Sequence, residues 1–287
     1  MSDTDDNNPD QLLSSSAAND WHSKRPLLME YESNARMDGF GIGNVANFMG
    51  GFILSQVLGL FVIVLVSVWI SKYLGGIGFA TNSQLFNFHP LLMTLGMVFL
   101  FGDAILVYRV LRNERKKILK ILHAVLNGSA LVLALLGSWA VYRFHYNMNI
   151  PNLYSLHSWI GGLTMVLFTG QFAIGFVSFL IPGLAPTYRR LILPYHVYIG
   201  LTLFVMVGAT ALLGITEKAI FSLSGKDGAP NYSDLTGATF VINMLGISVL
   251  LFVAVIVYLV TNNQFKRRPL PEEQALQLQN EETSSLN

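Results

Sequence analysis

The sequence predicts an all-α membrane protein with six transmembrane helices. Hydrophobic residues make up 52% of the chain and charged residues only 12%, whereas soluble domains carry about 25% charged residues. Six apolar runs each approach the roughly 20 residues that a helix needs to cross a bilayer. Membrane lipid offers no hydrogen-bond partners to open strand edges, so we expect every run to be a helix.

The six expected spans divide the chain into three parts. Residues 1–46 are rich in Asp, Asn and Ser and predict a disordered cytosolic tail. Residues 47–262 form the expected membrane domain, and residues 263–287 form a cytosolic C-terminal tail. The apolar runs are Gly51–Ile70, His89–Tyr108, Leu119–Val141, Leu156–Ile181, Leu191–Ile215 and Ala238–Val260.

The distribution of Lys and Arg predicts the orientation of these spans. The two tails and the loops after the second and fourth spans hold 14 of the 18 basic residues. The opposite side holds Lys72, Arg143, Lys218 and Lys226. The positive-inside rule therefore places both termini in the cytosol. The glycosylation sequon at Asn231 lies in a loop that this topology puts outside.

Composition also excludes several classes of function. The net charge is +1, which gives no general attraction to nucleic acid. The chain has no cysteine, so it has neither thiolate metal sites nor iron–sulfur clusters. A metal would have to be held by His, Met, a carboxylate or a macrocycle.

Four histidines lie inside or at the ends of the apolar runs. His89 and His157 begin spans that run inward, so we expect both near the outer face. His123 and His196 come early in spans that run outward, so we expect both near the cytosol. The two depths are on the order of 20 Å apart along the membrane normal.

Two histidines at each depth favour a haem over a zinc ion. A tetrahedral zinc site takes three or four converging ligands, whereas a six-coordinate haem takes two axial imidazoles from the protein. The sequence therefore predicts two haem sites within the bundle of the second to fifth helices. A single intramembrane histidine is more often an interhelical contact or a proton relay.

Two other functions are consistent with six spans and intramembrane histidines. One is a transporter of protons or divalent metal ions, which would place its polar groups at a midplane site with broken helices. The other is a structural organiser that tolerates histidines in its spans. Asp103, an acid within an apolar run, has no assigned role.

Several motifs resemble the cytochrome b561 family, and the resemblance covers about residues 50–268. They are Phe86-Asn87-Phe88-His89-Pro90, Val107-Tyr108-Arg109, Lys116 and Lys120 before His123, Tyr154-Ser155-Leu156-His157-Ser158-Trp159, Pro194-Tyr195-His196 and Leu213-Gly214-Ile215-Thr216-Glu217-Lys218.

The resemblance implies an ascorbate-dependent transmembrane oxidoreductase that holds two haem b groups. Cytosolic ascorbate would reduce the inner haem, held by His123 and His196. The outer haem, held by His89 and His157, would reduce monodehydroascorbate or a ferric chelate. The resemblance also implies a homodimer in a secretory-vesicle, endolysosomal or plasma membrane.

On the cytosolic side, Lys116, Lys120 and His123 follow the spacing of one helix face. With Arg189, the two lysines form a cationic pocket suited to the ascorbate anion or to haem propionates. Taken singly, such residues can equally be charges that set topology. The resemblance favours ascorbate binding by Lys116, Lys120 and Arg189, and inner-haem contacts by Arg109, Lys116 and Lys266.

On the outer side, we expect His145 in the loop before the fourth span. The resemblance makes it the candidate for binding the outer substrate or iron, since neutral imidazole is a common metal ligand. We expect contacts to the outer haem from Asn152, Tyr154, Ser155 and Glu217. Spacing alone favours a plain interfacial charge for Glu217, and the haem contact rests on the resemblance.

Overall fold

The computed structural model describes residues 42–226, 228–267, 269–270 and 273. It contains six helices that are long and apolar enough to cross a membrane. The described residues form helices and connecting loops, with one isolated β-bridge between Ser224 and Asn231. The protein is therefore an all-α, multi-pass membrane protein. Most of both expected tails lies outside the described residues.

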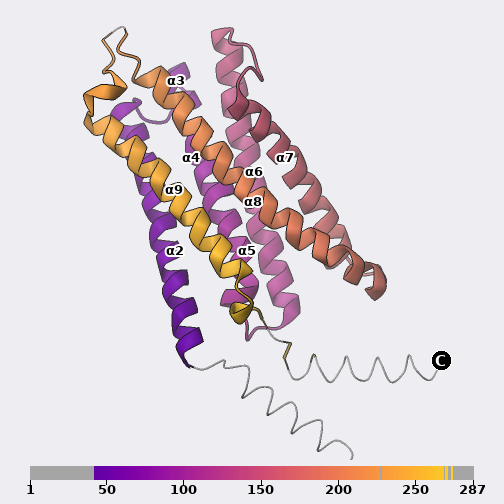
Figure 1. The fold of residues 1–287 in the computed structure, drawn as a ribbon. Helices are drawn as coiled ribbons and strands as arrows, with labels where there is room; N and C mark the ends of the chain where they lie inside the picture. Colours follow the sequence, from indigo (N-terminus) through magenta and orange to yellow (C-terminus); the bar gives the residue numbers. More distant parts are fainter. Residues whose placement is uncertain (1–41, 227, 268, 271–272, 274–287) are drawn as a thin grey trace, which may run out of the picture. The chain divides into compact units, whose positions relative to one another are not determined.

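The chain divides into two units, Met1–Phe48 and Met49–Asn287. The first unit is described only in its last residues, which are helical. The second unit contains the remaining helices (Figure 1).

The six spans are built from the following segments, several of which include a π-helical stretch. They are α2 (Ile42–Val68) with η1 (Trp69–Tyr73), then α3 (Asn82–Phe86), α4 (Phe88–Met93), η2 (Thr94–Leu100) and α5 (Phe101–Val110), then α6 (Lys116–Met148), α7 (Leu156–Gly175) with η3 (Phe176–Leu180), α8 (Pro186–Ser222) and α9 (Gly237–Thr261). Short 3-10 helices, η4 (Tyr232–Asp234) and η5 (Asn263–Phe265), flank α9.

Five of the six helices extend beyond their apolar runs at both ends, whereas the fourth begins with its run at Leu156 and ends at Leu180. The third helix, α6, begins at Lys116 and ends at Met148, so its polar ends continue beyond the apolar run Leu119–Val141. The fifth helix, α8, begins at Pro186 and passes through Pro194. Proline costs one backbone hydrogen bond inside a helix, yet it does not end this one.

Local sequence signals explain the position of the two helix termini that are nearest to the site. Ser155 caps α7: its side chain accepts from the Ser158 N–H, and the Ser158 side chain accepts from the Ser155 N–H. This reciprocal capping box fixes the chain entry immediately before His157. At the other end of the preceding loop, Asn149 ends α6 in the left-handed conformation, at φ 54°.

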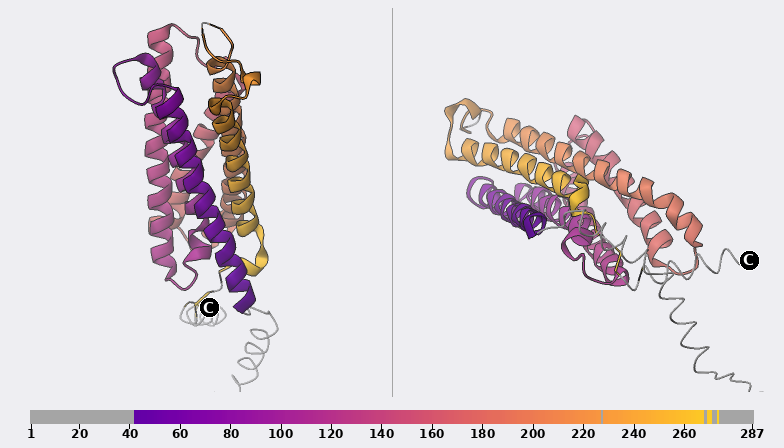
Figure 2. Two further views of the ribbon diagram at one scale, coloured as in Figure 1. Left: turned by 90° about the vertical axis from the view of Figure 1, so that its left-hand side faces the viewer. Right: turned by 60° about the horizontal axis from the view of Figure 1, so that its bottom comes forward.

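The packing of the helices brings the histidine-bearing segments together. The α6 helix packs against α4, η2 and α5, and α7 packs against α8. Figure 1 shows α8 between α7 and α9. The α2 helix packs on α9 and α8 through a buried apolar cluster that includes Val66, Trp69, Leu223 and Leu245, and Figure 2 shows α2 and α9 side by side.

Candidate functional site

The four intramembrane histidines form two pairs across helices. The ring centroids of His89 on α4 and His157 on α7 are 6.0 Å apart, with an interplanar angle of 86°. Those of His123 on α6 and His196 on α8 are 6.2 Å apart, at 68°. These are the same two pairs that the sequence analysis matched by depth.

Three of the histidines are oriented by a backbone carbonyl on a neighbouring helix. The Nδ1 atom of His89 lies 3.1 Å from the Gly137 oxygen. That of His123 lies 2.7 Å from the Ala104 oxygen, and that of His157 lies 2.9 Å from the Thr210 oxygen. A carbonyl can only accept, so each Nδ1 donates and each Nε2 keeps its lone pair for a metal.

His196 is held differently. Its buried Nδ1 has no hydrogen-bond partner among the described residues. Its backbone oxygen accepts a bond of 2.6 Å from the Gln171 side chain. The position of His196 is therefore fixed through its backbone and through the packing of its ring.

Glycines on the facing helix make room for two of the rings. A Cβ atom at Gly214 on α8 would lie 2.6 Å from Cε1 of His157, and one at Gly175 on α7 would lie 2.8 Å from Cε1 of His196. Real Cβ atoms essentially never approach so closely. Each glycine stands 18 residues after the histidine on its own helix. On each helix, a glycine makes room for the histidine ring of the other helix. We call these two glycine–histidine contacts, Gly214 with His157 and Gly175 with His196, the reciprocal notches.

The pair geometry fits a haem held by two imidazoles. Metal–nitrogen bonds of about 2 Å on both sides of an iron, with about 1.1 Å from each nitrogen to its ring centre, separate the centroids by about 6 Å. The observed 6.0 and 6.2 Å agree. Among the described residues, no group of three or more His, Cys, Asp or Glu could hold a metal ion.

The two pairs are well separated along the helices. On α6, the contact with His89 is made at Gly137, 14 residues after His123. On α8, the contact with His157 is made at Thr210, 14 residues after His196. At 1.5 Å per residue, both helices give a separation of about 21 Å.

A buried aromatic cluster lies between the levels of the two histidine pairs, as the residue numbers along each helix show. The Phe101 ring is 4.8 Å from Phe168 and 5.5 Å from Phe204, centroid to centroid. These residues come from α5, α7 and α8, and each is at most 4% exposed. The cluster therefore forms part of the buried packing between α5, α7 and α8.

The candidate ascorbate residues converge next to the His123–His196 pair. Lys120 donates to the Phe179 oxygen at 3.1 Å, and Arg189 donates to the Ile181 oxygen at 3.3 Å. The charges of Arg189 and Lys116 both act on Lys120. The Phe179 ring lies 5.2 Å from the His196 ring. Thus Lys116, Lys120 and Arg189 form one cationic cluster beside this pair.

Arg109 and Lys266, the other expected contacts of the inner haem, have different surroundings. Arg109 donates to the Asn262 oxygen at 2.7 Å and to the Val260 oxygen, so it holds the C-terminal end of α9. Lys266 is exposed at the end of η5. Haem contacts by these two residues stay predictions.

Glu217 connects two of the residues expected around the outer haem, Ser155 and Tyr154. Its carboxylate accepts from the Ser155 hydroxyl at 2.9 Å and from the Tyr154 phenol. Burial, and then Glu217, raise the pKa of the Tyr154 phenol. A phenol is protonated at neutral pH even without this shift, so Tyr154 donates to the carboxylate. Asn152 is exposed and has no hydrogen bond to another described residue.

The expectation that His145 lies in a loop is wrong. His145 belongs to the last turn of α6, and its ring stacks on Tyr154 with centroids 6.3 Å apart. Its Nδ1 is buried without a partner among the described residues. The helix continues past the apolar run to Met148. Hydropathy does not detect this last part of the helix, because its residues are mostly polar.

The sequence analysis missed two residues that adjoin the histidine pairs. The Tyr108 ring is 5.8 Å from His123, and the Phe86 ring is 6.1 Å from His89. Both stand in quoted motifs next to residues that were singled out, but their spacing alone did not assign them a role.

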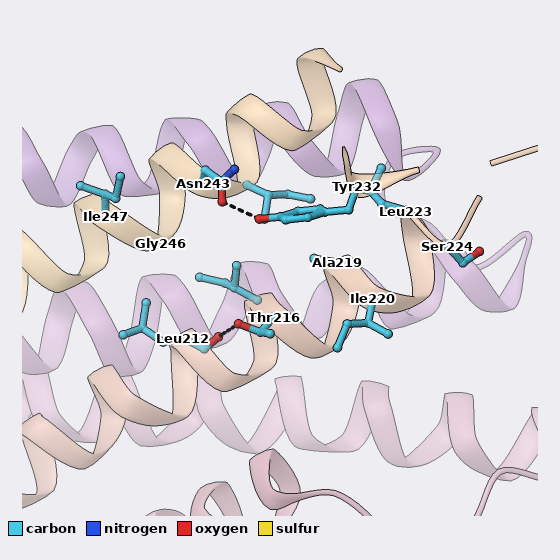
Figure 3. A pocket seen from close by; sticks show the side chains of 12 residues that line it. Leu212, Thr216, Ala219, Ile220, Leu223, Ser224, Tyr232, Asn243, Gly246 and Ile247 are labelled. Carbon is cyan, nitrogen blue, oxygen red and sulfur yellow. Dashed lines mark hydrogen bonds between the residues drawn. The ribbon is translucent and has the colours of Figure 1, made fainter. Parts of the chain in front are cut away.

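A cavity of about 600 Å³ lies elsewhere, between α8 and α9 (Figure 3). Its walls are mainly apolar, and Tyr232 donates to Asn243 across it. None of the four paired histidines lines it. We therefore place the candidate site at the histidine pairs and not in this cavity.

Sequence comparisons identify the family. A profile described as eukaryotic cytochrome b561 matches residues 88–222. The transmembrane ascorbate-dependent reductase CYB561 of Sus scrofa is 44% identical over 224 residues, covering 78% of this chain and 86% of that protein. The chain belongs to the cytochrome b561 family.

Two further relatives of this cytochrome b561 are also ascorbate-dependent reductases. The transmembrane ascorbate-dependent reductase CYB561 of Homo sapiens is 42% identical, covering 78% of this chain and 87% of that protein. The plasma membrane ascorbate-dependent reductase CYBRD1 of Xenopus laevis is 38% identical over 241 residues, covering 83% of each chain. Membership of this family implies the binding of haem b.

Proposed function

We propose that this cytochrome b561 carries electrons across a membrane from cytosolic ascorbate, through two b-type haems, to monodehydroascorbate or a ferric chelate on the other face. The observation that carries the proposal is the pair of ring separations, 6.0 and 6.2 Å, at two levels of one bundle. The names of the relatives, which are ascorbate-dependent reductases, support the donor.

In this proposal, His123 and His196 hold the haem near the cytosol, and His89 and His157 hold the other. A haem with both axial positions filled supplies one-electron transfer and has no open position for oxygen. The backbone carbonyls of Ala104, Gly137 and Thr210 keep the imidazoles in the tautomer that can bind iron.

The cationic cluster of Lys116, Lys120 and Arg189 binds the donor. Ascorbate is a monoanion at neutral pH, and charge-assisted hydrogen bonds from Lys and Arg are stronger than neutral ones. Giving up one electron and one proton leaves monodehydroascorbate, which is again a monoanion. On the opposite side, His145 and Tyr154 form the stacked surface that would contact the acceptor or its iron.

The same proposal covers the placement of the chain. Both termini lie in the cytosol, residues 47–262 form the functional membrane domain, and the protein is a homodimer in a secretory-vesicle, endolysosomal or plasma membrane. The His89–His157 pair then faces the non-cytosolic side.

A visible spectrum of the purified protein tests the proposal. We expect two b-type haems per chain by haem extraction, both reduced by ascorbate. Replacing one ligand, in His157→Ala, should reduce the content to one haem and leave that haem reducible by ascorbate. A colourless, folded preparation would contradict the proposal, as would loss of the ascorbate-reducible haem in His157→Ala.

A further inference from the structure

Lys218 is a cation that neither the proposed donor site nor the proposed haem ligands use. It lies on α8, four residues after Gly214, which contacts His157. The side chain is partly buried, and its ammonium stands 4.4 Å from the centre of the Phe86 ring. Its ammonium has no hydrogen bond or ion pair to any other residue that the structure describes.

The neighbouring carboxylate does not neutralise it directly. Glu217 faces α7, where Ser155 and Tyr154 occupy it, whereas Lys218 faces Phe86 at the end of α3. Withdrawing an ammonium from water is costly unless other interactions replace its hydration. An aromatic face replaces part of that hydration, and an adjacent negative charge would replace more.

A short chain of ring contacts connects Lys218 to a histidine pair. The Phe86 ring lies 6.1 Å from the His89 ring, and His89 lies 6.0 Å from His157. The ammonium is therefore at most about 10.5 Å from the centre of the His89 ring. At this distance in a poorly screened environment, a unit charge interacts appreciably with a redox centre.

We propose that Lys218 is a positioning residue that raises the reduction potential of the haem held by His89 and His157. This inference rests on the proposed function. Reduction adds one negative charge to the centre, and a nearby ammonium stabilises that charge. Lys218 thus favours arrival of the electron at the site that faces the acceptor.

Potentiometric titration of the haem bands tests this role. In a His196→Ala background, which should keep only the His89–His157 haem, Lys218→Gln is expected to lower the midpoint potential. At a fixed applied potential, the ratio of reduced to oxidised haem should fall on the order of tenfold. Lys218→Arg keeps the charge and should keep the potential, and Glu217→Gln should shift it in the opposite direction.

Two controls separate charge from structure. Lys72, an exposed lysine whose ammonium lies over the Tyr73 ring, provides the matched change Lys72→Gln, which should leave the potential unaltered. Because the chain has no cysteine, Lys218→Cys can carry an attached ammonium group or a neutral group of similar size. Only the ammonium should restore the potential.

The outcomes distinguish this inference from the function on which it rests. A wild-type preparation without haem overturns the proposed function. A preparation with two haems, in which Lys218→Gln leaves the potential unchanged or Lys218→Arg lowers it equally, overturns only the role of Lys218.

Discussion

At the scale of single residues, the histidine rings depend on what stands opposite them. A carbonyl fixes the tautomer of His89, His123 and His157, and a missing side chain at Gly175 or Gly214 gives the ring its space. Hydrogen-bonding partners of this kind orient metal ligands and raise their basicity.

Gly214→Ala tests the space beside His157. The added Cβ would lie 2.6 Å from the ring, while the Thr210 carbonyl holds the ring from moving away. We expect the variant to lose the haem of this pair, halving the haem content per folded chain. Gly162→Ala is the matched control, because a Cβ there meets nothing within 4 Å. Equal haem content in both variants would refute the steric argument.

The sequence identified the histidines but not their supports. An intramembrane histidine is visible because ionisable groups are rare in apolar runs. The backbone carbonyl that each ring contacts can belong to any residue type, so the sequence does not identify it. Nor does the sequence identify Glu217 as the hydrogen-bond partner of Ser155. These contacts depend on how the helices are rotated, which composition does not report.

At the scale of helices, the start of α6 and the end of η3 build the cationic cluster. The Lys120 side chain donates to the Phe179 carbonyl in η3, and the Arg189 side chain donates to the carbonyl of Ile181, the residue that follows η3. At this end of a helix, the dipole favours positive charge. The lysine spacing along α6 agrees with the expected helix face. The contribution of η3 could not be predicted from the sequence, because the acceptors are backbone carbonyls at the end of a π-helix.

Lys120→Gln tests the role of this cluster in binding ascorbate. Loss of a charged hydrogen bond costs about 1.5–3 kcal/mol, so we expect KM for ascorbate to rise at least about tenfold. The haem content should not change, because Lys120 does not contact a histidine. The measurement is the rate of haem reduction at varied ascorbate concentration.

The control for this change is Lys117→Gln. Lys117 is exposed on the same turn of α6, and its side chain has no hydrogen bond or ion pair to another described residue, so its loss should leave KM nearly unchanged. A similar rise in KM for both variants would point to general electrostatic attraction and not to a binding site.

At the scale of the membrane domain, hydropathy predicted the six spans well. All six apolar runs lie within the observed helices except for single residues at their ends, because crossing lipid requires continuous helical backbone. The helix ends were harder to predict, as His145 shows. Polar residues continue α6 past the apolar run and bring this side chain against Tyr154.

Single cysteines test which face of the domain meets the cytosol. The cysteine-free chain gives no background. Ser233 lies in the exposed connection between α8 and α9, and Asn113 in the exposed connection between α5 and α6. If the termini are cytosolic, an impermeant thiol reagent should label Ser233→Cys, and not Asn113→Cys, in intact cells whose surface displays the protein. Labelling in the reverse order would invert the proposed direction of electron flow.

The reciprocal notches have a consequence for how the family can change in length. His157 is accommodated by Gly214 and His196 by Gly175, so α7 and α8 are tied at two rungs with the same number of residues between them. An insertion in one helix alone would leave one ring facing a filled position. A longer separation between the two histidine pairs therefore requires insertions of equal length in both helices. For this reason we expect the distance between the two centres to change little in evolution.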